Sequence, residues 1–199
     1  MQIPHNEKFT DATGVLLAGG KSRRMGCDKA SIELSGRPLY FPALALLRQY
    51  FQTVIIAGDR PDLAQDDIPS IPDTYPGSAL GGLHAGLSAA LTEWIFVIPC
   101  DMPYPDASLL KLLYDLREEV DVVVPKTPAG YEPVFAFYHK RCLPIFDEAL
   151  RNGRNSIFSL YPQLKVSFLE WKDMPRGWEK SLLNINTRED LLNIKEGLS

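Results

Sequence analysis

Residues 13–20, TGVLLAGG, decide the fold class of this chain. Val15, Leu16 and Leu17 form an unbroken apolar run that ends in glycines. A short run of this kind is typical of a strand that is buried on both faces. Strands are buried in this way when helices cover both sides of a mostly parallel sheet. The stretch therefore predicts an α/β fold.

Strands and helices alternate along the rest of the chain. Apolar and β-branched runs predict further strands at 53–59, 68–73, 93–101, 120–126, 132–140, 165–171 and 181–186. Apolar residues at helical spacing predict helices at 35–51, 79–91, 106–119, 141–151, 155–161 and 187–198. Asp106 and Thr187 stand at N-cap positions, with Asp190 at the capping-box position of the last helix. The alternation predicts a three-layer α/β/α domain with a mostly parallel central sheet.

The length of 199 residues predicts a single domain over the whole chain. We expect residues 1–11 to form a flexible N-terminal extension. The stretch KDMPRGWEK, residues 172–180, is the best candidate for a long mobile loop.

Composition excludes several classes of partner. The net charge of −4 argues against nucleic-acid binding, which needs a basic surface. The N-terminal stretch lacks the apolar region of a secretory signal, and no apolar run is long enough to span a membrane. The three cysteines form no C-x-x-C pair. We therefore expect a cytoplasmic protein with reduced thiols and no membrane or nucleic-acid partner.

Residues 17–29, LAGGKSRRMGCDK, combine glycines with clustered cations directly after the first strand. Glycine lets backbone N–H groups point into an anion-binding nest. Arg24 and Lys29 add full charges that phosphates accept. A solvated basic turn is the simpler interpretation. The position after a buried strand favours a phosphate site, although neither standard phosphate-loop pattern is present.

Three further segments follow predicted strands with polar residues. Asp101 stands at the end of the strand predicted at 93–101, where a carboxylate can bind Mg²⁺ or simply form a turn beside proline. Asp73 precedes a Gly-rich turn that leads into a helix, whose N-terminus favours anions, although the segment taken alone is more simply a connection without a ligand. Asn186 lies just before the last helix and is either a metal ligand or a cap residue. Because ligands bind beyond the carboxyl ends of parallel strands, we expect these segments to share one site.

Taken together, these segments resemble the molybdenum cofactor guanylyltransferase family, within the wider nucleotidyltransferases, over residues 12–195. GVLLAGGKSRRMGCDK is similar to the family's entry motif, and PDTYPGSALGGL, PCDMP and NINTREDL are similar to its later motifs. The resemblance implies a Rossmann-like nucleotidyltransferase fold. It also implies an enzyme that transfers GMP from GTP to the phosphate of molybdopterin and releases pyrophosphate, with Mg²⁺ as its cofactor and proteins that deliver the pterin as possible partners.

The resemblance also implies residue roles. Arg24 and Lys29 would hold the triphosphate, Asp73 would contact the nucleoside, and Asp101 would bind Mg²⁺ with Asn186 as a second ligand. The remaining residues would line the nucleotide (Leu17, Ala18, Gly19, Gly20) or border the acceptor (Gly77, Gly82). This chain departs from some relatives at Ala57, Gly58 and Asp59, where an asparagine contacts the nucleoside, and at Ala79, where proline is frequent.

Two alternatives stay open. A sister nucleotidyltransferase would use CTP on the same pterin, or a nucleoside triphosphate on a sugar or alcohol phosphate. Relatives that take CTP tend to carry L-A-A-G in the entry motif, so Gly19 after Ala18 favours GTP. A non-catalytic nucleotide-binding protein on the same fold would lack Arg24, Lys29 or Asp101, and all three are present.

Overall fold

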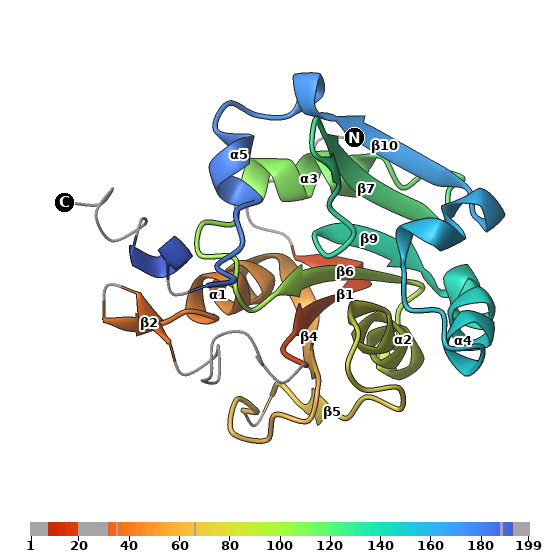
Figure 1. Cartoon of the computed structure of the whole chain (residues 1–199), viewed down its shortest axis with the longest axis horizontal. Coiled ribbons are helices and arrows are strands. Elements are labelled where there is room, and N and C mark those ends of the chain that lie inside the picture. The colour runs from red at the N-terminus through yellow and green to blue at the C-terminus, as the bar shows by residue number, and fades with distance from the viewer. Residues whose placement is uncertain (1–7, 20–31, 35, 66, 188, 193–199) are drawn as a thin grey trace.

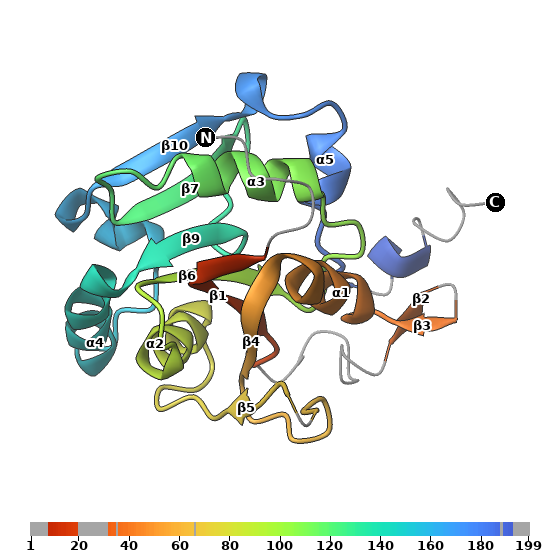
Figure 2. The same cartoon turned by 180° about the vertical axis from the view of Figure 1, so that it is seen from behind.

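The computed structural model describes residues 8–19, 32–34, 36–65, 67–187 and 189–192 (Figure 1). Its centre is an eight-stranded sheet with the order β10-β7-β9-β6-β1-β4-β5, and β8 pairs with the end of β7. The strands are β1 (Phe9–Leu17), β4 (Phe51–Ala57), β5 (Ser70–Ile71), β6 (Trp94–Pro99), β7 (Val122–Thr127), β8 (Gly130–Tyr131), β9 (Ala136–His139) and β10 (Val166–Glu170). A separate antiparallel pair consists of β2 (Glu33–Leu34) and β3 (Arg37–Pro38). Figure 2 shows the order of the large sheet from β10 at one end to β5 at the other.

The pairing of β1, β4, β5 and β6 is parallel throughout, and β10 also runs parallel to β7. β9 is antiparallel to both of its neighbours, β6 and β7. Since β6 and β7 therefore run in the same direction, their carboxyl ends lie at the same edge as those of β1 and β4. The predicted three-layer fold with a mostly parallel sheet is confirmed.

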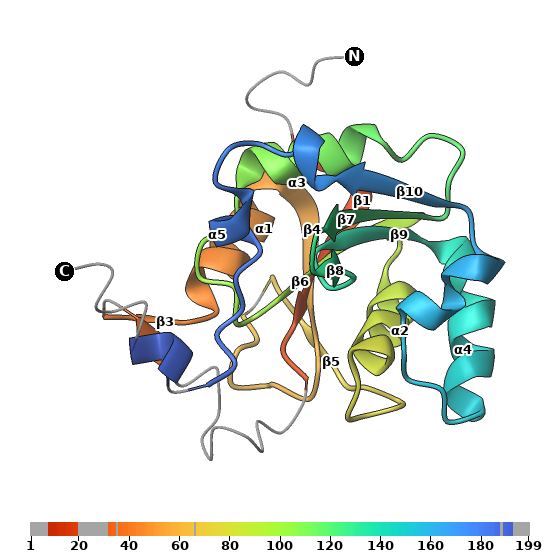
Figure 3. The same ribbon diagram turned by 45° about the horizontal axis from the view of Figure 1, so that its top comes forward.

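Helices cover both faces of the sheet. They are α1 (Phe41–Tyr50), α2 (Ala79–Ala89), α3 (Ala107–Asp115), α4 (Leu143–Arg151) and the short α5 (Trp178–Ser181). Leu16 packs in the core layer that holds α1 and α3, and Val15 packs in the layer that holds α2 and α4. Figure 3 shows α2 beside α4 on one side and α1 with α3 on the other. The unbroken apolar run of β1 is thus needed because both of its faces are buried.

The predicted helix starts are confirmed at two places. Asp106 accepts hydrogen bonds from the backbone N–H groups of Ser108 (2.6 Å) and Leu109 (2.9 Å) and caps α3. In the last helix, the backbone N–H of Asp190 donates to Thr187 Oγ1 at 3.0 Å, and Asp190 Oδ2 accepts from the N–H of Thr187 at 2.8 Å. The aspartate therefore completes a capping box.

Three local predictions are wrong. Residues 9–11 belong to β1 and not to an extension, because Phe9 is buried and stacks on Tyr114 with ring centroids 3.8 Å apart. Residues 172–180 do not form one long loop, since the 3₁₀ helix η4 (Trp171–Asp173) and α5 occupy most of them. Residues 182–186 form no strand, because the described part of this segment has no ladder partner.

The segment predicted as a helix at 155–161 forms a 3₁₀ helix, η3 (Phe158–Gln163). A second 3₁₀ helix, η2 (Lys140–Cys142), leads directly into α4. The predicted helix at 141–151 is otherwise confirmed.

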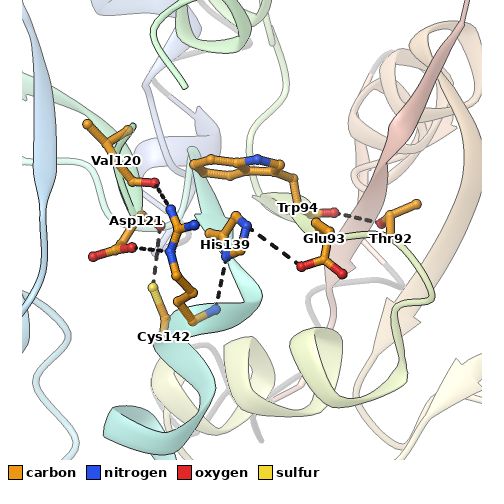
Figure 4. Close-up of polar contacts among 8 residues, drawn as sticks. Thr92, Glu93, Trp94, Val120, Asp121, His139 and Cys142 are labelled. Carbon is orange, nitrogen blue, oxygen red and sulfur yellow. Dashed lines mark hydrogen bonds and ion pairs between the residues drawn. The ribbon is translucent and has the colours of Figure 1, made fainter. Parts of the chain in front are cut away.

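A polar cluster lies at the amino ends of β6 and β7 (Figure 4), and a backbone hydrogen bond from Lys165 links it to the start of β10. Asp121 accepts hydrogen bonds from Arg141 Nε at 2.7 Å and from the backbone N–H of Lys165 at 2.9 Å. His139 Nε2 lies 3.7 Å from Glu93 Oε2. Burial raises the pKa of the neighbouring Cys142 thiol to about 12, so this cysteine is an unreactive packing group. The cluster is structural and lies at the sheet edge opposite to the carboxyl ends of these strands.

Candidate functional site

Three backbone hydrogen bonds bring four strand ends together at the carboxyl edge. The N–H of Cys100 donates to the carbonyl of Leu17 at 3.0 Å, just after β6 and at the end of β1. The N–H of Ala18 donates to Ala57 O at 2.9 Å, and the N–H of Gly58 donates to Ile71 O at 2.8 Å. The residues that follow β6, β1, β4 and β5 therefore form one continuous rim.

Gly19 and Gly58 lie in direct contact within this rim. A Cβ atom added to Gly58 would stand 2.7 Å from the backbone nitrogen of Gly19. A Cβ added to Gly19 would stand 2.8 Å from Asp73 Oδ2. Gly58 needs glycine because a Cβ there would meet backbone atoms, whereas a Cβ on Gly19 would have to displace the Asp73 carboxylate. The result is a glycine-lined cradle with Asp73 at its wall.

Asp73 is half-buried, and its Oδ1 atom has no hydrogen-bond partner among the described residues. Burial raises the pKa of this carboxyl above its ordinary value. A carboxylate in this condition binds well to a ligand that presents N–H or O–H donors. The structure therefore places Asp73 where the sequence analysis expects a nucleoside contact, and that role stays a prediction.

Asp101 is 9% exposed and lies directly beyond β6, at the same rim. Its backbone carbonyl accepts a hydrogen bond from the N–H of Ile185 at 3.0 Å. This bond brings Asn184 and Asn186, which flank Ile185, to the side of Asp101. The side-chain oxygen of Asn184 is buried and has no hydrogen-bond partner in the described part of the chain.

A carboxylate and the amide side chains of nearby asparagines offer the oxygen donors that suit a hard divalent cation such as Mg²⁺. Within the described ranges no cluster of three or more His, Cys, Asp or Glu side chains forms a closed metal site. Mg²⁺ commonly uses one or two protein ligands and completes its shell with water and substrate phosphates. The residues at Asp101 therefore fit a metal that is shared with a nucleotide.

The two glycines assigned to the acceptor side differ in their surroundings. A Cβ added to Gly82 would lie 3.2 Å from Leu17 Cδ2, so this glycine allows α2 to pack against β1. Gly77 lies in the turn before α2, and a Cβ added there would have nothing within 4 Å. Ser78 caps α2 by accepting a hydrogen bond from the N–H of Gly81 at 3.1 Å. Of the pair, Gly77 has the space for a substrate beside it.

Gly20, Arg24 and Lys29 lie outside the described residues, as does Cys27. Their proposed phosphate contacts therefore rest on the sequence. Gly19, the last described residue before this segment, stands at the rim, so the segment starts at the candidate site.

Sequence reasoning missed Glu132, a further carboxyl at this edge besides Asp73 and Asp101. It lies in the turn between β8 and β9, and its backbone N–H donates to Pro125 O at 3.0 Å. The side chain is half-buried, and burial raises its pKa. The apolar pattern of EPVFAFYHK predicts one strand from residue 132 onward and so conceals this turn, whereas β9 begins only at Ala136.

Comparisons with known proteins agree on one family. A family model described as "MobA-like NTP transferase domain" matches residues 14–166. A probable molybdenum cofactor guanylyltransferase of Pelotomaculum thermopropionicum is 32% identical over 188 residues, which cover 92% of each chain. A molybdenum cofactor guanylyltransferase of Vibrio atlanticus is 34% identical over 187 residues, covering 92% of this chain and 94% of the relative.

Solved structures share the fold. A molybdopterin-guanine dinucleotide biosynthesis protein A from Archaeoglobus fulgidus superposes with a TM-score of 0.81 at 23% identity, over 94% of this chain and 98% of that one. A putative protein from Aquifex aeolicus superposes with a TM-score of 0.75 at 28% identity, over 88% and 94% of the two chains. In the described residues, no helix is both long enough and apolar enough to cross a membrane.

Proposed function

Because the chain belongs to the MobA-like NTP transferase family, we propose that it transfers GMP from GTP to the phosphate of molybdopterin. The products are pyrophosphate and the guanine dinucleotide form of the cofactor. The observation that carries the proposal is the rim at which the Gly19 cradle, Asp101 and Asp73, whose Oδ1 has no partner among the described residues, follow neighbouring strands. We propose that the reaction takes place in the cytoplasm, where a delivery protein hands the pterin to this enzyme.

The reaction is an in-line displacement at the α-phosphorus of GTP. A terminal phosphate oxygen of the acceptor forms the new P–O bond, and the bond from the α-phosphorus to the β-phosphate oxygen breaks. The attacking oxygen is already anionic at neutral pH, since the second pKa of a phosphate monoester is about 6. The protein therefore needs no general base and acts by positioning and by neutralising charge.

Each residue of the site has a part in this scheme. The backbone at Gly19 accommodates the nucleotide, and Asp73 accepts hydrogen bonds from donors of the nucleoside. Arg24 and Lys29 hold the triphosphate and stabilise the charge on the departing pyrophosphate. Asp101 and Asn186 would hold Mg²⁺, which when bound neutralises charge on the phosphates.

The direct test measures pyrophosphate release from GTP with molybdopterin and Mg²⁺, with CTP and ATP in parallel reactions. We expect release with GTP and little with the other two nucleotides. Preferential release with CTP would replace the proposed donor, and no release with any nucleotide would overturn the proposed activity.

The role of Asp101 is tested by Asp101→Ala, with Asp115→Ala, an exposed aspartate at the end of α3, as the matched control. Loss of one electrostatic contact in a transition state commonly lowers the rate by about 10²–10³-fold. We expect that loss for Asp101→Ala in a folded protein, and none for the control. Near-normal turnover of Asp101→Ala would exclude this residue as the metal ligand.

A further inference from the structure

Tyr75 is held at three points, although it lies in a turn between β5 and α2. Its hydroxyl donates a hydrogen bond to Asp147 Oδ1 on α4 at 2.9 Å. Its ring packs edge-on against His84 of α2, with centroids 5.2 Å apart and an interplanar angle of 82°. Its carbonyl oxygen touches the first turn of α2 so closely that a Cβ on Gly81 would overlap it. The residue is therefore fixed at its backbone, its ring and its hydroxyl.

The Asp147 carboxylate is itself held in place. Oδ2 forms an ion pair with Arg151 Nη2 at 2.8 Å, one turn further along α4. Oδ1, which accepts the bond from Tyr75, also lies 3.6 Å from His84 Nε2. The groups that face this carboxylate therefore come from the turn, from α2 and from α4 itself. α2 and α4 pack side by side, so the carboxylate has a rigid support (Figure 3).

This anchor lies two residues away from Asp73. On the other side of Asp73, Ile71 is held by the hydrogen bond that its carbonyl accepts from the N–H of Gly58. Asp73 thus stands between two fixed points, and its carboxylate fits directly against Gly19. Only Thr74 separates Tyr75 from Asp73, so a shift of Tyr75 is passed on to Asp73.

The Asp73 side chain would not stay at the cradle without restraint. Burial raises the pKa of its carboxyl, which means that the charged form is destabilised by leaving water. Oδ1 gains no hydrogen bond from the described residues in return. When no ligand is bound, the charged carboxylate is therefore more stable in a solvated position, and the anchor at Tyr75 opposes that movement.

We propose that Tyr75 and Asp147 are positioning residues that hold the turn at 72–77, so that Asp73 stays at the cradle and the nucleoside part of the donor binds tightly. This inference rests on the proposed function in one respect, namely that the cradle binds a nucleoside triphosphate. Asp147 acts from α4 through Tyr75 and is not itself a ligand of the substrate.

The first test measures the free protein. The variant Tyr75→Phe removes the hydroxyl and keeps the ring and the backbone contact. We expect the pKa of the Asp73 carboxyl, followed by carbon NMR, to fall towards the ordinary value of 3.8 in this variant because the side chain becomes more solvated. The control is Glu148→Gln on the next position of α4, where the nearest described cation is Arg154 at 3.9 Å. An unchanged Asp73 pKa in Tyr75→Phe would refute the positioning role.

The second test measures GTP binding by calorimetry. We expect Tyr75→Phe and Asp147→Ala each to weaken binding by about tenfold, which lies within the range for coupled contacts. The double variant should be no weaker than either single one, and Glu148→Gln should match the wild type. In an Asp73→Ala background, Tyr75→Phe should have no further effect, because the tyrosine acts through Asp73.

Failure of the two ideas can be told apart. A wild-type chain that binds no GTP contradicts the proposed function, while the Asp73 pKa still decides the positioning role. A wild-type chain that binds GTP, with Tyr75→Phe binding equally well, overturns this inference alone. If Tyr75→Phe lowers the GTP affinity equally in the wild-type and the Asp73→Ala backgrounds, Tyr75 acts by another route. That result would also overturn this inference.

Discussion

Replacing Gly58 by alanine tests how closely β1 and β4 must meet at the rim. Gly58 and Gly130 have nearly the same positive φ, +135° and +134°. A Cβ on Gly58 would lie 2.7 Å and 2.9 Å from the nitrogen and Cα of Gly19, and 3.0 Å from the carbonyl carbon of Ala18. A Cβ on Gly130 would have nothing within 4 Å. Gly130→Ala is therefore a control that has the same backbone cost without the steric clash.

The expected magnitudes follow from this difference. A non-glycine residue in such a conformation costs about 1–3 kcal/mol, and both variants share that loss. The backbone clash at Gly58 adds about 1–3 kcal/mol, the usual cost of overpacking, because the atoms it meets cannot rotate away. Domains are commonly stable by about 5–15 kcal/mol, so both variants should remain folded.

Urea unfolding followed by circular dichroism measures the loss of stability, and calorimetry measures GTP binding. We expect Gly58→Ala to be less stable than Gly130→Ala by about 1–3 kcal/mol. We also expect Gly58→Ala alone to lose GTP affinity, since the clash displaces Gly19 from its position at the rim. Equal stability losses in the two variants, or unchanged GTP binding by Gly58→Ala, would refute the reasoning.

Three further predictions follow from the described contacts. Gly81→Ala should destabilise the protein by about 1–3 kcal/mol in urea unfolding and weaken GTP binding, because the new methyl group meets the Tyr75 carbonyl; unchanged binding would contradict this. Asp106→Ala should cost about 1 kcal/mol in the same assay, with normal turnover, because α3 loses its N-cap; a loss of activity at full stability would be inconsistent with a capping role. Burial raises the pKa of the Asp121 carboxyl, but the hydrogen bonds from the Lys165 N–H and from Arg141 outweigh burial, so the net pKa is lowered. The charged Asp121 therefore stabilises the folded protein above the unfolded-state pKa of this group. This stabilisation is lost as the pH falls through the lower folded-state pKa. Urea midpoints between about pH 2 and 7 should therefore fall less steeply for Asp121→Asn than for the wild type, and superimposable profiles would exclude this contribution.

The elements that sequence predicted correctly depend on local patterns. The apolar run of β6 and the cap at Asp106 need only neighbours in the chain, and both are confirmed. The errors arose where distant contacts decide the outcome. Phe9 joins β1 because Tyr114, more than a hundred residues later, stacks on it. The stretch SLLNIN is predicted as a strand, yet its backbone N–H groups donate to the carbonyls of Trp178, Lys180 and Asp101, and it pairs with no strand of the described sheet.

The candidate site was predictable as a set of segments but not as a geometry. The motif residues Gly19, Asp73 and Asp101 could be named because each follows an apolar strand. Their mutual distances could not, since they depend on the order in which the strands pair. Gly58 contacts Gly19 although the two residues are remote in sequence. Burial by residues that are likewise remote removes water from the carboxyls of Asp73 and Glu132.

The sequence by itself determined the alternation of strands and helices, the burial of β1 on both faces and the chemical types available at the strand ends. Only the tertiary structure decided that β6, β1, β4 and β5 lie side by side. That order brings Asp101, Gly19, Gly58 and Asp73 to one rim, and packing of α2 against α4 places Asp147 on Tyr75. The physical reason is that periodicity and capping are local properties of a chain, whereas strand order, desolvation and contacts between helices arise only when the whole core packs.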